Sequence, residues 1–241
     1  MSAVVKGIAL TMISGLRILS AAITRIAHVM GIWHEMKKRI VIFGGTGDTG
    51  LCSLRTAVEK GLEVRAFVRD KAEIPEDLSN KVEAIVGDVT NAKEVADAIA
   101  GTDFVVVVRN TRTDVAPTNM LPQGMKNIVD AMKAHSVKLI SVCIKAYLFY
   151  KCKIPRNQLQ EINSDIDHLE MLEIIKSSGL KWVVIMPMHI ADRPKSEYKI
   201  VFESGPVPSN YISKHDLGAS LVECLEDPKY YEKVCTIGNV L

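Results

Sequence analysis

The chain lacks the features that mark metal-binding, disulfide-rich and nucleic-acid-binding proteins. Its five cysteines are scattered, and none forms the C-x-x-C spacing of a zinc or redox site. A charge excess is also missing, because the net charge is only +2 and there is no block of Lys and Arg interleaved with aromatic residues. We therefore expect reduced thiols, a cytoplasmic location, no nucleic-acid partner and a small-molecule substrate.

Residues 1–36 lack the uninterrupted apolar run of a membrane-spanning helix, because Arg17 and Arg25 interrupt it well short of about 20 residues. They also lack any acidic residue before Glu35, and their polar residues recur at amphipathic-helix spacing. One interpretation is a mitochondrial-type transit peptide. The other, which we favour, is alternative-start sequence or a disordered tail, because "KKRIVIFGG" follows Met36 as at the start of many dinucleotide-binding proteins. We thus predict an extension over 1–36 and one domain over 37–241.

From Lys38 onward, short apolar runs alternate with helix-length amphipathic segments, and no internal repeat occurs. The runs are "RIVIFG", "LEVRAFV", "VEAIVGD", "DFVVVV", "KLISVCI" and "WVVIMP". Their near-continuous Val and Ile content is typical of parallel strands covered on both faces. The pattern predicts an α/β fold with a doubly wound, Rossmann-like parallel sheet, and the tail after Pro187 adds a small C-terminal substrate-side region with a strand, a helix and a last short strand.

A glycine pattern directly follows the first predicted strand. "VIFGGTGDTG" places Gly44, Gly47 and Gly50 between that strand and a helix. Glycine allows a tight turn and a close approach of backbone N–H groups to a pyrophosphate at the helix N-terminus. The alternative is a purely structural turn, but the strand and helix on either side favour a dinucleotide site.

The ends of the next two strands bear on which cofactor is bound. Arg69 stands where NAD-dependent enzymes usually present an acid to the ribose, and arginine there favours the 2′-phosphate of NADPH. The alternative is a solvated arginine. "GDV", which contains Asp88 and Val89, ends the third strand where adenine is expected, unless it is only a strand-to-helix turn.

From Met36 to its end, the chain resembles NADPH-dependent flavin reductases, also called biliverdin-IXβ reductases, which are atypical short-chain dehydrogenase-like proteins. The matching segments are "GGTGDTG", "VRD", "VGDV", "NTRTDVAPT", "AMKAHSVK", "SGLKWVVIMPMHI" and "ISKHDLG". The resemblance implies a monomer that reduces FMN, FAD, riboflavin or biliverdin with NADPH. It also implies cofactor contacts along Gly44, Thr46, Gly47, Asp48, Thr49, Gly50, Arg69, Asp88, Val89, Thr111, Arg112 and Met188, with His189 near the nicotinamide.

The chain departs from the family pattern at three places. Arg109 and Asn110 replace a Leu-Gly pair of the family. Glu73 replaces a basic residue that in the family helps to hold the 2′-phosphate. Lys145 occupies the position of the family's active-site serine. Lys145 follows a buried strand. It is predicted either to face the flavin as a catalytic cation or to extend its ammonium to water with only its stem packed.

The acid of the usual short-chain dehydrogenase relay is missing, because no Tyr-x-x-x-Lys pair follows the fifth strand. The catalytic candidates are Lys145, at the position of the family's serine, and His189, at the carboxyl end of a predicted strand. His168 and His215 are expected to be structural. Hydride transfer to a flavin depends more on positioning than on acid catalysis, so an NADPH-dependent reductase is the leading hypothesis. The main alternative is a non-catalytic NADPH-binding sensor or scaffold, and the missing Tyr-Lys pair disfavours a nucleotide-sugar epimerase.

Overall fold

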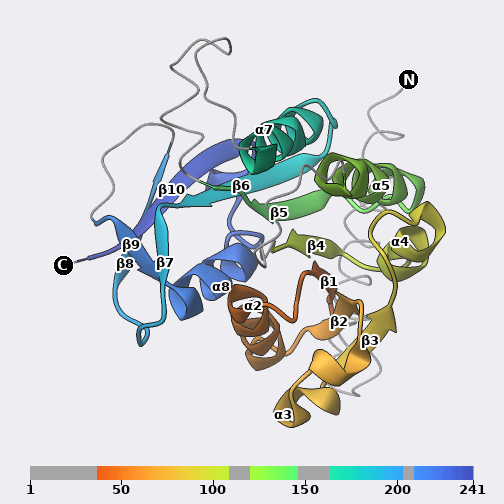
Figure 1. Cartoon of the computed structure of the whole chain (residues 1–241), viewed down its shortest axis with the longest axis horizontal. Coiled ribbons are helices and arrows are strands. Elements are labelled where there is room, and N and C mark those ends of the chain that lie inside the picture. Colours follow the sequence, from red (N-terminus) through yellow and green to blue (C-terminus); the bar gives the residue numbers. More distant parts are fainter. Residues whose placement is uncertain (1–36, 109–119, 146–162, 203–208, 241) are drawn as a thin grey trace, which may run out of the picture. The chain divides into compact units, whose positions relative to one another are not determined.

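The centre of the computed structural model is an eight-stranded sheet in the order β3-β2-β1-β4-β5-β6-β10-β8 (Figure 1). The structure describes residues 37–108, 120–145, 163–202 and 209–240, and those from Lys38 on form one compact unit. The strands are β1 (Arg39–Phe43), β2 (Glu63–Val68), β3 (Val82–Val86), β4 (Phe104–Val107), β5 (Leu139–Cys143), β6 (Lys181–Pro187), β8 (Tyr198–Phe202) and β10 (Lys233–Asn239).

The six apolar runs of the sequence are the strands β1 to β6, which confirms the predicted parallel sheet. Every described residue of β4 and β5 is buried, as expected for strands covered on both faces. β10 continues the sheet in parallel with β6, whereas the edge strand β8 runs antiparallel to β10. The chain order reverses between β1 and β4, and open α/β sheets bind their ligands at the carboxyl ends of such strands.

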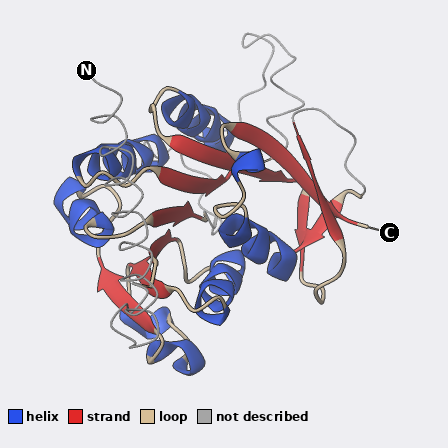
Figure 2. Cartoon of the chain, turned by 180° about the vertical axis from the view of Figure 1, so that it is seen from behind, coloured by secondary structure: helices blue, strands red, loops and turns tan. Residues whose placement is uncertain are grey.

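Helices cover both faces of the sheet, as Figures 1 and 2 show from opposite sides. The helices are α2 (Asp48–Glu59), α3 (Glu76–Ser79), α4 (Ala92–Ile99), α5 (Met120–Ala134), α7 (Asn163–Lys176) and α8 (Lys214–Glu223), with short 3₁₀ turns at Lys71–Glu73 and Pro228–Tyr230. α2 and α8 pack on one face, and α4, α5 and α7 pack on the other. Each face therefore has its own hydrophobic core.

Glycines in the left-handed conformation follow three of the helices. Gly61, Gly101 and Gly179 follow α2, α4 and α7 with φ angles of 75°, 70° and 72°. A left-handed residue at this place closes a helix at little steric cost when it is glycine.

The C-terminal region contains a second sheet that the sequence did not indicate. It consists of β7 (His189–Ala191) and β9 (Tyr211–Ser213), which pair in parallel with His189 opposite Tyr211. Because β7 follows β6 after one residue, this small sheet begins at the carboxyl end of the main sheet. None of the described helices is long and apolar enough to cross a membrane.

Candidate functional site

The turn between β1 and α2 exposes backbone N–H groups at the carboxyl edge of the sheet. Gly44 has a φ of 76°, and Gly47 precedes α2 in an extended conformation with no side chain capping the helix. The first N–H groups of a helix have no partner within it, so this turn suits a phosphate. A Cβ at Gly50 would lie 2.8 Å from the Gly45 Cα, and therefore only glycine allows helix and turn to approach this closely.

Arg69 and Asp88 lie beyond the ends of the two neighbouring strands, β2 and β3. The Asp88 carboxylate accepts hydrogen bonds from the Thr90 backbone N–H at 2.8 Å and the Thr90 hydroxyl at 2.7 Å. These bonds lower the pKa of Asp88, and the charge of Arg69 lowers it further. Asp88 is therefore an anion at neutral pH, and within the described part of the chain no carboxylate forms an ion pair with Arg69.

A pocket of about 300 Å³ joins the glycine turn to Arg69 and Asp88. Six residues predicted from the sequence line it: Gly44, Thr46, Gly47, Arg69, Asp88 and Val89. Apolar side chains from α5 and α7 form its inner wall, with Met120, Leu121, Met125, Ile128 and Met171 among them. The site thus offers backbone N–H groups and a guanidinium for phosphates beside an apolar wall for a base.

The other predicted contacts of the glycine turn lie outside this pocket. Thr49 and Gly50 are buried in the first turn of α2, and Asp48 is exposed at its start. Thr111 and Arg112 lie outside the described residues, as do Arg109 and Asn110.

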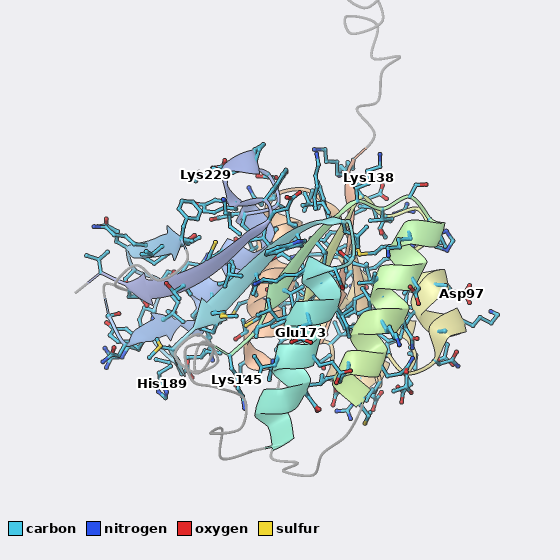
Figure 3. All side chains as sticks on the ribbon, turned by 90° about the horizontal axis from the view of Figure 1, so that it is seen from above. Asp97, Lys138, Lys145, Glu173, His189 and Lys229 are labelled. Atoms are coloured by element: carbon cyan, nitrogen blue, oxygen red, sulfur yellow. The ribbon has the colours of Figure 1, made fainter. Side chains whose placement is uncertain are left out.

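The catalytic candidates lie beyond the pocket lining, toward β6. Lys145 follows β5 and is half-buried, and the backbone N–H of Ile144 before it bonds to the Ile185 carbonyl of β6 at 3.0 Å. Figure 3 shows Lys145 and His189 at the same edge of the molecule, opposite Lys138, which precedes β5. The structure therefore brings the two candidates to the carboxyl ends of adjacent strands. Met188 and His189 are both exposed there.

A buried polar network connects the small sheet to α8 and β10. Asp216 accepts hydrogen bonds from the Asn239 amide at 2.7 Å and the Ser196 backbone N–H at 3.1 Å. The side-chain oxygen Oδ1 of Asn239 accepts a hydrogen bond from the Ser213 backbone N–H at 2.7 Å. These bonds tie β10, β9 and the chain after β7 to the start of α8, which fixes the strand that carries His189.

His215 and His168 have the structural settings expected for them. His215 lies in the first turn of α8, and its Nδ1 is 3.3 Å from the Cys52 Sγ of α2. Burial raises the pKa of the Cys52 thiol, so this pair is not an activated nucleophile. His168 is buried within α7.

Sequence reasoning missed the residues around β9, chiefly Tyr211 and Arg193. The Arg193 Cζ lies 4.5 Å from the centre of the Tyr211 ring. Tyr211 directly precedes the "ISKHDLG" segment. An aromatic side chain next to that segment was the feature of the sequence that could have pointed to this contact.

Comparison with known proteins identifies the class of this fold. The model of a family described as NAD(P)H-binding matches residues 44–228. An NAD(P)H azoreductase from Xenophilus azovorans is 27% identical over 204 residues, which are 78% of this chain and 64% of that protein. A 3-beta-hydroxysteroid dehydrogenase from Mycolicibacterium neoaurum is 39% identical over 67 residues, 28% of this chain and 18% of that protein. The chain thus spans less than two thirds of the length of these relatives.

Solved structures share the fold at low sequence identity. A short-chain dehydrogenase/reductase from Veillonella parvula in complex with NADP has a TM-score of 0.70 at 16% identity, covering 85% of this chain and 95% of that one. A Rossmann-fold NAD(P)-binding family protein from Shigella flexneri has a TM-score of 0.68 at 19% identity, covering 84% and 93%. Since the family match spans most of the chain and the glycine turn lies at the strand switch point, the chain belongs to the NAD(P)H-binding family of Rossmann-fold proteins.

Proposed function

We propose that the protein is an NADPH-dependent reductase that transfers hydride to a flavin or a linear tetrapyrrole. The observation that carries the proposal is the arrangement of the carboxyl edge of the sheet. The cofactor pocket opens at β1 and β4, and the same edge continues through Lys145 to an exposed strand, β7, which contains the exposed apolar residue Ile190 and directly follows exposed Met188. A planar acceptor needs such an open, partly apolar surface beside the cofactor.

The residues of the chain are assigned roles by their position at this edge. The N–H groups of the glycine turn bind the pyrophosphate, and Arg69 binds the ribose 2′-phosphate. When bound, NADPH supplies the hydride, and the chain holds donor and acceptor in line. Lys145 provides a positive charge at the end of β5, where negative charge grows on the acceptor ring as it is reduced.

The substrate class rests on the resemblance to flavin and biliverdin-IXβ reductases, and the azoreductase relative supports a reductase in general terms. The alternative is a non-catalytic NADPH-binding sensor, in which Lys145 at the family's serine position marks a lost activity. Both proteins would bind NADPH, so binding alone does not separate them.

The test is an acceptor panel with the purified full chain and NADPH. FMN, FAD, riboflavin, biliverdin isomers and one azo dye are compared by the rate of NADPH consumption above the acceptor-free rate. We expect consumption that saturates with a flavin or a biliverdin. Tight NADPH binding without consumption by any acceptor would support the sensor, and consumption with the azo dye alone would replace the flavin proposal by an azoreductase.

A further inference from the structure

A cation, Arg193, packs on the small sheet that contains His189. Arg193 comes two residues after β7, but its guanidinium packs over the ring of Tyr211 at 4.5 Å. Tyr211 pairs with His189 across β7 and β9. The stacking therefore folds the Arg193 side chain back toward the strand position next to His189, instead of letting it extend away into solvent.

The backbone of this cation is held as well. The Ser213 hydroxyl donates a 2.6 Å hydrogen bond to the Arg193 carbonyl oxygen, and Ser213 is itself buried and bonded to Asn239. A guanidinium that stacks on an aromatic face keeps its in-plane N–H donors available. Arg193 is thus pre-positioned, and less side-chain entropy is lost when it binds an anion.

Nearby acids are occupied by other partners. The carboxylate of the adjacent Asp192 bonds to the Lys214 ammonium at 2.8 Å, which lowers the pKa of Asp192. Asp216 is buried in its bonds to Asn239 and Ser196. Among the residues that the structure describes, no carboxylate forms an ion pair with Arg193, so its charge is available for a ligand.

Exposed apolar side chains precede and follow His189 in the chain. Met188 and Ile190 are 38% and 43% exposed. Because successive side chains of a strand point to opposite faces, Ile190 lies on the other face of the small sheet from His189 and its partner Tyr211. The anchored cation therefore shares its face of the small sheet with His189.

We propose that Arg193 on Tyr211 is the subsite for an anionic arm of the acceptor. The inference rests on the proposed function, because it assumes that a planar acceptor lies along β7. The ligand chemistry is a phosphate or carboxylate joined by a flexible linker to a conjugated ring, as in FMN or in a tetrapyrrole with propionate arms. Such a subsite selects FMN over riboflavin, which has the same ring and no phosphate.

The test is equilibrium binding, so that it does not depend on turnover. Flavin fluorescence is titrated with the full chain saturated with NADP⁺, using FMN and riboflavin in parallel. We expect FMN to bind about tenfold more tightly, which corresponds to about 1.4 kcal/mol, the size of one charge-assisted contact. In Arg193→Gln the ratio of the two dissociation constants should fall to within about twofold.

Two further variants separate this subsite from general charge. Lys199→Gln removes one exposed positive charge from β8 and should leave the FMN-to-riboflavin ratio at its original value. Tyr211→Ala keeps Arg193 but removes its platform, and the ratio should decrease. Raising the salt concentration should also reduce the ratio, because an exposed charge contact is screened.

The carboxylate arm is tested by comparing biliverdin with its dimethyl ester. Selective loss of FMN binding in Arg193→Gln identifies a phosphate subsite, and selective loss of biliverdin over its ester identifies a carboxylate subsite. Equal binding of each acid and its neutral partner by the unmodified chain overturns the inference, as does no binding of any of them or an unchanged ratio in Arg193→Gln. If the subsite proposal were overturned, NADPH consumption with riboflavin as the acceptor would still support the proposed reductase.

Discussion

We predict that the choice between NADPH and NADH depends on Arg69. Its guanidinium lines the pocket at the end of β2, and Asp88 is the acid near it. Replacing Arg69 with Ala should remove about 1 to 3 kcal/mol of the preference for NADPH over NADH, the worth of a charge-assisted hydrogen-bonded contact. Dissociation constants of both cofactors, measured by calorimetry, give this preference directly.

A matched control for this substitution is Lys81→Ala. Lys81 is an exposed cation that precedes β3, at the end of the strand away from the pocket, and its loss should leave the cofactor preference unchanged. Equal affinity of the unmodified protein for NADPH and NADH would refute the role given to Arg69.

For Lys145 we propose a chemical role rather than a role in binding. Lys145→Met keeps the volume of the side-chain stem and removes the positive charge at the end of β5. We expect kcat/KM for FMN to fall at least about tenfold, or about 1.4 kcal/mol of transition-state stabilisation, with little change in the NADPH dissociation constant. Lys138→Met, at the opposite end of β5 in Figure 3, is the control and should change neither quantity. A change within about twofold in Lys145→Met would show that the ammonium only extends to water.

Residues at strand ends could be predicted, because their place follows from the sheet alone. Once β1, β2 and β3 are parallel neighbours, Gly44, Arg69 and Asp88 must meet at one edge, and the pocket contains all three. The stacking of Arg193 on Tyr211 could not be predicted, because it joins residues 18 positions apart with the whole of β8 between them in the chain. Nothing in the local sequence indicates that these two strands pair.

At the scale of elements, α2, which begins at the glycine turn, packs closely against α8. The Ser53 hydroxyl of α2 donates a 3.0 Å hydrogen bond to the Gly218 carbonyl of α8. A Cβ at Gly218 would lie 2.5 Å from the Cys52 Cβ and 2.8 Å from the Ser53 backbone nitrogen. The two helices can pack this closely only because α8 has no side chain at this position.

Gly218→Ala therefore has two opposing effects on the free energy of unfolding. Helix propensity alone predicts a gain of about 1 kcal/mol, whereas overpacking against backbone atoms costs about 1 to 3 kcal/mol. We expect the overpacking to prevail, with a lower urea midpoint at an unchanged m-value and weaker NADPH binding, because α2 begins at the phosphate turn. A higher midpoint would mean that the helices move apart easily and that their contact does not fix the turn.

The elements that the sequence predicted are those with long periodic patterns. β1 to β6 stand out as apolar runs and α2, α4, α5 and α7 as amphipathic segments between them. β7 and β9 were missed because three-residue strands are too short for periodicity to show. The antiparallel direction of β8 depends on its pairing with β10, a tertiary contact that its own residues do not encode.

At the scale of the whole molecule, the doubly wound order of the sheet follows from general rules. Right-handed crossovers leave few arrangements for strands that alternate with helices, and the observed order of the parallel strands reverses once, between β1 and β4. The position of the cofactor pocket follows from that reversal. The proposed acceptor side, in contrast, depends on the C-terminal region, where the small sheet and its polar network form through tertiary contacts that the local sequence does not indicate.

The eight strands of the main sheet all lie after Lys38, so the fold should not depend on residues 1–36. We predict that a chain beginning at Met36 melts within about 5 °C of the full chain. NADPH at about 100 times its dissociation constant should stabilise either form by about 2.7 kcal/mol, because it binds the folded state alone. For a domain of this size the gain corresponds to a rise of roughly 5 to 10 °C in Tm. Thermal melts of both chains with and without NADPH measure these two quantities. A larger drop on truncation, or a smaller NADPH-induced rise in the shorter chain, would show that residues 1–36 contribute to the stability or the cofactor site of the domain.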